Sequence, residues 1–420
     1  MKKYDLIVVG GGLAGFASAI SASRNGLNVL IVEKSSSLGG ASTNGLVTPF
    51  MPNFTTINKK TVDFSYSIFK EIVNRLEKAN ALLYGSHFDN ERLKLILNEM
   101  AQENNVDLLY HAYLCHVTKD KKSIKSITVA TVEGEMELCA SYFIDATGDA
   151  QLSYLSGCKT LLGRQSDNLC QPMTLCFRVG NIDTKRFFDS LPRVQEQYKQ
   201  SLANGELINP RENILVFHTP VKNVLHFNTT RVVKKNPTSA MEKTEAEIIA
   251  RKQVFELFDF LKKYADGMEE AFILLTAEEI GVRESRKIVG EYVLTEQDCL
   301  SLTKFEDGVV ACCYEIDIHS PEGTGTSHHY FKDGEYYTIP YRSLLPKEID
   351  NMLVAGRCIS SDHGAQASYR IMPTVCSIGE VAGLVISMAY TDKSIPREIN
   401  VTNLQKVLRE KTYESKTNKL

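Results

Sequence analysis

The stretch YDLIVVGGGLAG, residues 4–15, holds a short, β-rich apolar run followed by glycines in the spacing G-x-G-x-x-G. In that spacing Gly10 permits a tight turn off the strand, and Gly12 lets the backbone approach a pyrophosphate. Gly15 then allows close packing between the strand and a following helix. The stretch therefore predicts the first strand and turn of a dinucleotide-binding fold.

The residues after this turn supply the rest of a β-α-β unit. A small-residue segment suited to a helix runs from Phe16 to Arg24, and a second apolar strand, 28–32, ends at Glu33. The helix N-terminus offers unpaired N–H groups to phosphates, and Glu33 can accept hydrogen bonds from ribose hydroxyls. Because a carboxylate repels a 2′-phosphate, the pattern disfavours NADP. The glycine spacing, the surrounding β-α-β order and the position of Glu33 all indicate dinucleotide binding. They disfavour the alternative, a glycine-rich turn without a ligand.

Three further segments resemble FAD enzymes of the glutathione-reductase-like superfamily rather than NAD-only proteins. The first, EKSSSLGGAS at 33–42, has the Gly-Gly pair and the small hydroxylated residues that wrap the pyrophosphate in that superfamily. The second, FIDATGD at 143–149, is similar to its ATG motif, and the third, NMLVAGR at 351–357, to its last FAD-contacting strand. That strand usually ends in Gly-Asp. Here Arg357 replaces the Asp, and it could meet a phosphate directly.

Taken whole, residues 4–390 resemble the FAD-dependent oxidoreductase family, which is related to fumarate reductase and succinate dehydrogenase flavoproteins. The resemblance implies an α/β fold, with a three-layer, Rossmann-like FAD-binding domain and an inserted α+β substrate domain. No histidine occurs at 39–50, where the related fumarate reductases carry a covalent histidyl link, so we expect non-covalent FAD. The residues implied for FAD binding are Gly10, Gly12, Leu13, Ala14, Gly15, Glu33, Lys34, Gly39, Gly40, Ala41, Ser42, Leu114, Ala146, Thr147, Gly148, Gly356, Arg357 and Ser368.

The chain is expected to divide into an FAD-binding domain at 1–158 and 346–392, a substrate-side domain at 159–345 and a tail at 393–420. Hydrophobic periodicity predicts the elements within these units. The predicted helices cover 65–80, 90–104, 182–202, 241–264 and 375–390, and the predicted strands 108–117, 125–138, 173–179 and 221–233. The substrate-side segment lacks a second G-x-G-x-x-G, and the chain lacks a CxxC or CxxxxC pair. These absences disfavour a pyridine-nucleotide-disulfide reductase.

Composition and charge exclude several other classes of protein. The chain is 43% hydrophobic and 24% charged, which excludes a disordered protein, and its net charge of −3 gives no basic footprint for nucleic acid. No secretory signal precedes the first strand, and no apolar stretch approaches the ~20 residues of a membrane span. We therefore expect a cytoplasmic protein with no membrane span. The ten cysteines lack metal-ligand spacing, so we expect reduced thiols and no metal site.

The segment EIDIHS, residues 315–320, is a candidate for acid–base chemistry. On a strand, Asp317 and His319 share one face because side chains alternate with period two. The carboxylate can then orient the imidazole and set its tautomer, as a general acid–base residue needs. The alternative is a hydrogen-bonded sheet histidine without a catalytic role.

Two arginines lie three residues apart in GVRESRKIVG, residues 281–290. On a helix Arg283 and Arg286 would share a face and could bind a carboxylate together. On a strand they would point to opposite faces. The alternative is structural ion pairing with Glu284 or Asp298.

Three more residues complete the candidate catalytic set. Arg342 is a further cation, in the segment IPYR. His363 and Arg370 precede a small-residue helix that, in the superfamily, points its N-terminus at the flavin. For His363 and Arg370 a purely structural role is the alternative.

These features predict an FAD-dependent dehydrogenase or reductase. Hydride would pass between flavin N5 and a small organic substrate that is anionic or carries a conjugated carbonyl group. Arginines would bind a carboxylate or polarise a carbonyl, and His319 or His363 would move the proton. One alternative is an oxygen-using oxidase or monooxygenase, and another is an electron-transfer flavoprotein without turnover. The sequence leaves open the substrate, a separate electron donor or acceptor, and the oligomeric state.

Overall fold

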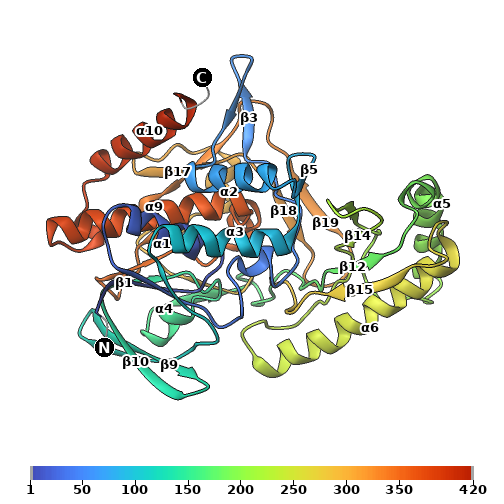
Figure 1. Ribbon diagram of the computed structural model, residues 1–420, viewed down its shortest axis with the longest axis horizontal. Coiled ribbons are helices and arrows are strands. Elements are labelled where there is room, and N and C mark those ends of the chain that lie inside the picture. Colours follow the sequence, from blue (N-terminus) through green and yellow to red (C-terminus); the bar gives the residue numbers. More distant parts are fainter. Residues whose placement is uncertain (1–2, 418–420) are drawn as a thin grey trace.

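A seven-stranded sheet organises the larger part of the molecule in the computed structural model, which describes residues 3–417 (Figure 1). Its order is β7-β2-β1-β10-β9-β8, with β21 paired to β10. Strands β7, β2, β1, β10 and β21 are parallel, whereas β10, β9 and β8 form an antiparallel meander. The bounds are β1 Tyr4–Val9, β2 Val29–Val32, β7 Asp107–Leu109, β8 Tyr113–Asp120, β9 Ser123–Thr131, β10 Gly134–Asp145 and β21 Met352–Val354.

Alternate residues of β1 contribute to two apolar layers, one on each face of the sheet, because successive side chains of a strand point to opposite faces. Leu6 and Val8 pack with the helices of one face. Ile7 and Val9 pack with residues of the meander on the other face. The helices of the first face are α1 Leu13–Arg24, α2 Ser67–Lys78, α3 Asn90–Glu103 and α9 Met372–Asp392. The expected three-layer α/β fold is confirmed.

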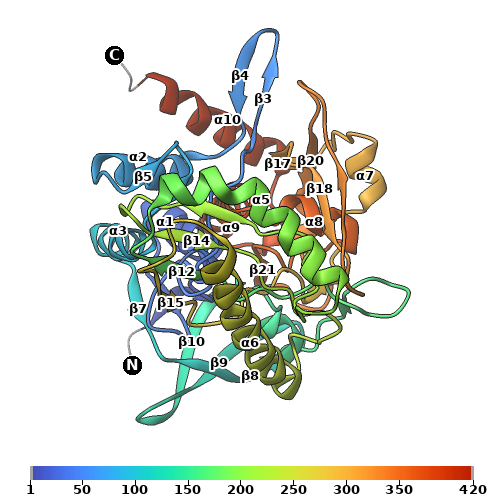
Figure 2. The same cartoon turned by 90° about the vertical axis from the view of Figure 1, so that its right-hand side faces the viewer.

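A second unit is built on an antiparallel sheet of order β13-β14-β12-β15, covered by two long helices (Figure 2). Its bounds are β12 Phe177–Gly180, β13 Val216–His218, β14 Leu225–Phe227, β15 Phe272–Thr276, α5 Thr184–Ala203 and α6 Ala240–Tyr264. Its own core collects apolar residues mostly from 173–280. Buried residues between Ile288 and Leu345 pack into the first core instead. The two cores therefore divide the chain at different points from the domain boundaries that the sequence suggested.

The remaining elements are short, apart from the C-terminal helix. Strands β17 and β20 pair with each other, as do β18 and β19, β11 and β16, β3 and β4, and β5 and β6. Their bounds are β3 Phe54–Ile57, β4 Lys60–Asp63, β5 Leu82–Leu83, β6 His87–Phe88, β11 Thr160–Leu162, β16 Arg286–Ile288, β17 Gly308–Cys312, β18 Ile316–His319, β19 Thr326–His329 and β20 Tyr337–Pro340. The other helices are α4 Gln151–Leu155, α7 Glu296–Leu300, α8 His363–Tyr369 and α10 Val401–Thr417.

Most predicted elements are confirmed, but the strands predicted at 173–179 and 221–233 are shorter than expected. Only 177–180 and 225–227 form strands there. Beyond them, the Thr230 hydroxyl accepts from the Leu175 N–H at 2.8 Å and donates to its carbonyl at 3.1 Å. A side chain therefore replaces the backbone partner and interrupts the ladder. The strand predicted at 108–117 is divided between β7 and β8.

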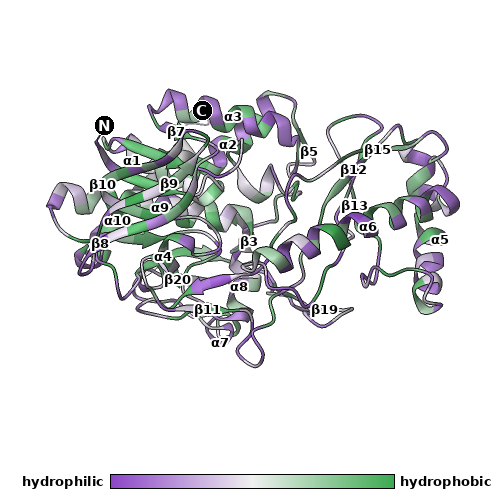
Figure 3. Ribbon diagram, turned by 90° about the horizontal axis from the view of Figure 1, so that it is seen from below, coloured by the Kyte–Doolittle hydropathy of each residue, from purple (hydrophilic) through white to green (hydrophobic). Residues whose placement is uncertain are grey.

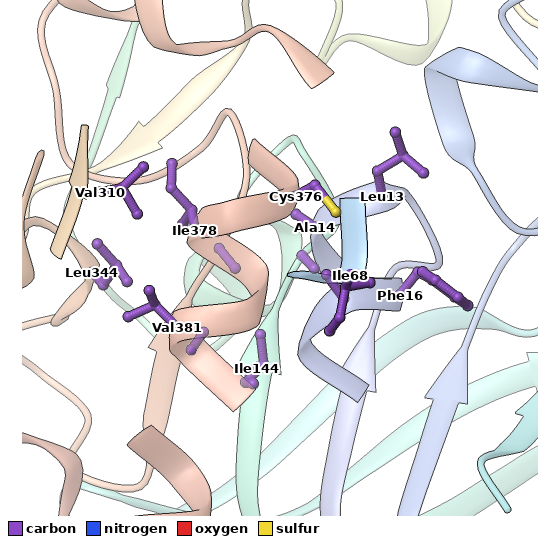
Figure 4. Close-up of a cluster of buried hydrophobic side chains, with 14 of the residues drawn as sticks. Leu13, Ala14, Phe16, Ile68, Ile144, Val310, Leu344, Cys376, Ile378 and Val381 are labelled. Atoms are coloured by element: carbon purple, nitrogen blue, oxygen red, sulfur yellow. The ribbon is translucent and has the colours of Figure 1, made fainter. Parts of the chain in front are cut away.

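Helices α1 and α9 cross with their backbones in contact, among the buried side chains of Figure 4. A Cβ atom at Gly379 would lie 2.0 Å from the Ala14 carbonyl oxygen, and one at Gly383 would lie 2.1 Å from that of Ser18. Only glycine fits at such a distance. The contact places the N-termini of both helices on the same side of the sheet.

Helix α9 differs from the expectation that no stretch is long and apolar enough to cross a membrane. By length and composition it qualifies, and 83% of its most apolar window is buried inside the protein. Figure 3 shows this helix among the apolar elements around the sheet. The helix contains many glycine, alanine and serine residues, which suit it to close packing. Because of these small residues, the sequence did not show an uninterrupted run of large apolar side chains.

The α1–α9 contact gives a stability prediction. We expect Gly379→Ala to lower the free energy of unfolding by about 1–3 kcal/mol, because the added methyl group overpacks the crossing. The helix propensity of alanine works in the opposite direction, by about 1 kcal/mol. Urea unfolding measures the change, with Gly323→Ala as the control, because no atom of the described residues lies within 4 Å of its Cβ position. An unchanged or higher stability of the Gly379 variant would contradict the steric account.

Candidate functional site

A cavity of about 520 Å³ lies between the seven-stranded sheet and the second unit. One wall comes from loops that follow the parallel strands and from the first turn of α1. These residues are Gly12, Leu13, Ala14, Gly39, Ala41, Ala146, Gly148, Gly356 and Arg357. The other wall comes from the second unit, from the β18–β19 hairpin and from the segment between α8 and α9. Nine residues predicted to bind the cofactor therefore converge on one cavity.

The glycines of the first turn divide into two kinds. A Cβ at Gly10 would lie 2.4 Å from the Ala146 carbonyl oxygen, and one at Gly15 would lie 1.9 Å from that of Gly10. Packing within the protein therefore requires both glycines. At Gly12 no atom of the residues that the structure describes lies within 4 Å of the Cβ position, and the residue lines the cavity. The space beside Gly12 at the N-terminus of α1 is therefore open to a phosphate-bearing ligand.

Glu33 directly follows β2 beside this turn, as expected, but it does not line the cavity. Its carboxylate accepts from the Gly11 N–H at 2.5 Å and from the Ser35 N–H at 2.8 Å. These bonds hold the Gly-rich turn against the second strand. The geometry is compatible with a ribose partner at the remaining oxygen lone pairs.

Other predicted cofactor residues lie outside the cavity lining. Lys34 pairs with Glu279 at 2.8 Å, and Leu114 packs in the core beneath the meander. Ser368 donates to the Tyr314 carbonyl at 2.5 Å and lies 2.9 Å from the Tyr337 hydroxyl. Gly40, Ser42 and Thr147 also do not line the cavity, although each lies beside a residue that does.

Arg357 occupies the position where the superfamily usually has Asp. The charge of this arginine is balanced by Asp149, which lies elsewhere in the chain. Its guanidinium donates to Asp149 Oδ1 at 2.7 Å, and Ser285 donates to the same oxygen at 2.6 Å. Burial raises the pKa of the Asp149 carboxyl, but Arg357 and Ser285 outweigh it and hold that pKa below its usual value. The buried Arg357 Nε has no hydrogen-bond partner among the described residues. This arginine can therefore still bind a polar ligand.

Besides Arg357, three arginines line the cavity from different segments of the chain. Arg283 donates to the Pro172 carbonyl at 2.9 Å, and Arg211 donates through Nε to Asn213 at 3.2 Å. Among residues 3–409, neither forms an ion pair with a carboxylate. Burial, with Arg370 and Arg211 nearby, lowers the pKa of Arg283 to about 9. The wall therefore concentrates positive charge.

Arg370 reaches the cavity from the end of α8. Its Nη2 lies 3.4 Å from Gln171 Oε1, 3.4 Å from the Asp317 carbonyl oxygen and 3.8 Å from the Asp317 carboxylate. Its buried Nε lacks a hydrogen-bond partner among the described residues. Asp317 therefore faces an arginine of the lining. The lining holds four arginines and three carboxylates, Glu212, Glu315 and Asp317, so its net charge remains positive.

Asp317 and His319 share one face of β18, as the sequence predicted. His319 Nε2 lies 3.3 Å from Asp317 Oδ2, and its Nδ1 lies 3.2 Å from Arg231 Nη2. Because a guanidinium only donates, Nδ1 accepts, and the proton is on Nε2. Burial, followed by the charge of Arg283, lowers the pKa of His319 to about 3. The imidazole is therefore neutral, and both of its nitrogens are engaged.

Arg231 is the residue that fixes this tautomer. Its side chain is 1% exposed, pairs with Glu212 at 3.1 Å and donates to the carbonyls of Gly323 and Gly325 at 3.2 and 3.0 Å. Burial, with Arg211 nearby, lowers its pKa to about 10. Arg231 thereby ties the β18–β19 hairpin to the second unit.

The structure does not bring three of the predicted catalytic residues to the cavity. Arg286 begins β16 and binds Gln151 and the Asp149 carbonyl, so it does not share a helix face with Arg283. Arg342 is half exposed and pairs with Asp307 at 2.9 Å. His363 lies 2.7 Å from buried Glu284, which also binds Lys287. The helix interpretation of the two arginines is wrong because their segment is extended.

Sequence reasoning missed four residues of the cavity region. Arg211, Glu212 and His328 line the cavity, and Arg231 lies behind it. His328, on β19, lies 2.8 Å from Glu315. Arg231 stands in the polar stretch NTTRVVKK, 228–235, which gives no signal that its charge is buried. The others lie in segments without a recognisable motif.

Comparison with known proteins identifies a family. A family model described as FAD dependent oxidoreductase matches residues 5–408 of this chain. Thioredoxin reductase of Ureaplasma parvum is 36% identical over 72 residues, which cover 17% of this chain and 22% of that relative. The chain therefore matches about a fifth of the length of that curated relative.

Two solved structures are similar over nearly the whole chain. A geranylgeranyl bacteriochlorophyll reductase-like protein of Thermoplasma acidophilum has a TM-score of 0.48 at 13% identity, and the match covers 98% of this chain and 84% of that one. For p-nitrophenol 4-monooxygenase of Pseudomonas putida the TM-score is 0.46 at 12% identity, with 97% and 84% covered.

The neutral His319 gives a prediction about pH. Between pH 6.5 and about 3 the unfolded imidazole binds a proton that the folded one does not, so stability falls as pH falls through this window. One such group contributes about 1.4 kcal/mol per pH unit. We expect His319→Gln to make the pH slope of the unfolding free energy shallower, as measured by urea unfolding from pH 4 to 7. Exposed His329→Gln is the control, and equal slopes for both variants would contradict the assignment.

Proposed function

Because the chain belongs to the FAD dependent oxidoreductase family, we propose that it is a dehydrogenase or reductase of a small organic anion or carbonyl-conjugated substrate. When bound, FAD supplies the hydride donor or acceptor. One observation carries the proposal: Arg211 and Arg283 line the cavity and have no carboxylate partner among the described side chains. Arginines in that state favour an anion, because charge-assisted hydrogen bonds to a carboxylate offset their burial.

The residues of the first wall fit FAD. The open space at Gly12 and the positive end of α1 suit its pyrophosphate. The unpartnered Nε of Arg357 supplies a further donor. The N-terminus of α9, where Met372 and Val375 line the cavity, adds a second positive helix end. FAD bound without a covalent link, as expected from the sequence, is part of the proposal.

In this proposal His319 positions other groups and does not transfer the proton. Its Nε2–H donates to Asp317, which faces Arg370. The chain of contacts from Arg231 through His319 and Asp317 thereby fixes the orientation of Arg370. Substrate carboxylate or carbonyl oxygen would bind to Arg283 and Arg370, with Arg211 completing the site. The sequence hypothesis that His319 or His363 moves the proton is replaced here.

The proton would be moved by His328. It lines the cavity at the exposed end of β19, and Glu315 lies 2.8 Å from its Nδ1. A carboxylate in that position orients the ring and leaves Nε2 to exchange protons with the substrate or with solvent. The cavity is large enough to admit a substrate, which favours an enzyme that turns over a substrate rather than a flavoprotein that only transfers electrons. A cytoplasmic location and a separate electron donor or acceptor remain part of the proposal.

Cofactor binding is tested by Gly12→Ala. The methyl group meets no protein atom, so the apoprotein should unfold with a free energy within about 1 kcal/mol of the wild type. In the space that the proposal gives to the pyrophosphate, we expect the same methyl group to weaken FAD binding at least tenfold, measured by flavin fluorescence. Gly15→Ala is the contrast, because it should destabilise the apoprotein itself. Unchanged FAD affinity in Gly12→Ala would refute this part of the proposal.

Anion binding is tested on FAD-loaded protein by titrating carboxylates and following the flavin absorbance. We expect Arg283→Gln to weaken carboxylate binding about 10- to 100-fold, the loss typical of a charge-assisted hydrogen bond. Arg342→Gln is the matched control, because that arginine pairs with Asp307 outside the cavity. Binding that is equally strong in both variants, or weakened equally in both, would argue against a cationic substrate site.

A further inference from the structure

We infer that the substrate is amphipathic, with an anionic head at the arginines and an apolar body that extends along the second sheet toward Phe217. This inference rests on the proposed function and names the substrate class for the same site. It follows from how polarity changes along the cavity wall.

Side chains on one face of the β12–β14–β13 sheet form consecutive rows along the cavity. The registers place Phe217 opposite His226 and His226 opposite Arg178. Because residues two apart share a face, the next row holds Cys176, Asn228 and Leu215. The lining includes Phe217 and every member of that second row, so this face forms the wall.

The cationic end lies beyond the second row. Arg283 contacts the hydroxyl of Thr174, two positions before Cys176, and its Nη2 lies 3.5 Å from Asn228 Oδ1. Arg211 binds Asn213, two positions before Leu215. Both arginines are therefore anchored at the same end of the strands.

The opposite end of the wall is apolar. Phe217 lines it from the sheet, next to Leu215 of the middle row, and Met51 also lines the cavity, from the segment after the Gly-Gly turn. Four residues separate the Thr174 level from the Phe217 level, which corresponds to about 13 Å along the strands. A ligand that fills this length needs an apolar body behind its charged head.

The far end of the wall offers no charge to a second anionic group. His226 is fully buried, neither of its ring nitrogens has a hydrogen-bond partner among the described residues, and burial lowers its pKa to about 3. Its neutral ring stacks on Phe217, with the centroids 6.1 Å apart. Arg178, next in the row, binds Asn90 and does not line the cavity. One anionic head and one apolar end therefore fit the site.

The test measures dissociation constants of straight-chain carboxylates for the FAD-loaded protein by flavin absorbance. The probes are acetate, butanoate, hexanoate and octanoate, with 1-octanol as the uncharged comparison. We expect affinity to rise about fourfold per methylene, as burial of CH₂ groups gives, and octanol to bind much more weakly than octanoate. Equal affinities for acetate and octanoate would overturn the inference and leave the proposed anion site standing. If no carboxylate perturbs the flavin, the proposed function itself fails.

Two variants locate the apolar end. We expect Phe217→Ser to weaken octanoate at least tenfold and to leave acetate within twofold, because only the longer ligand reaches this ring. Leu215→Asn should do the same to a smaller extent, as a second measurement should the first variant fold poorly. Phe255→Ser, on the exposed side of α6, is the control. Loss of acetate and octanoate binding in equal proportion would contradict an extended apolar subsite.

Discussion

The contact between the backbones of α1 and α9 is the constraint on which the site depends. Gly379 and Gly383 bring α9 against the carbonyls of Ala14 and Ser18, a distance that no other residue allows. With the axes this close, the first turns of both helices open on one cavity. The two helix dipoles then add to the arginines on the facing wall. A packing requirement in the core thus gives the cavity its positive potential.

The cavity keeps that potential because its carboxylates have other partners. Glu212 is bound by Arg231, and Glu315 lies 2.8 Å from His328 Nδ1. Asp317 receives the Nε2–H of His319 and faces Arg370. Arg211 and Arg283 remain, and their hydrogen-bond acceptors within the described part of the chain are all neutral. Since a guanidinium stays charged at any physiological pH, such a site is stable mainly when an anion enters it. The charges that line the cavity therefore favour an anionic substrate, whereas the fold alone does not indicate a substrate class.

Much of the fold followed from local rules. The β-α-β unit, the hairpin between β9 and β10 and the long helices each follow from glycine spacing or apolar periodicity, which depend on neighbours in the chain. The pairing of Asp317 with His319 followed from the period of a strand. The protonation of His319 did not, because Arg231 lies 88 positions away and only tertiary contact brings them together. Arg286 and Arg342 were equally plausible in sequence, yet each found a structural partner outside the cavity.

The central claim is the proposal that hydride passes between FAD in this protein and a small organic anion, rather than from reduced FAD to oxygen. It is tested most directly by photoreducing the FAD-loaded protein without oxygen and mixing it rapidly with unsaturated carboxylates or with oxygenated buffer. We expect reoxidation by at least one carboxylate, such as fumarate, crotonate or cinnamate, to be faster than reoxidation by oxygen. Fast reoxidation by oxygen with formation of peroxide, and none by the carboxylates, would contradict the claim and favour an oxidase or monooxygenase.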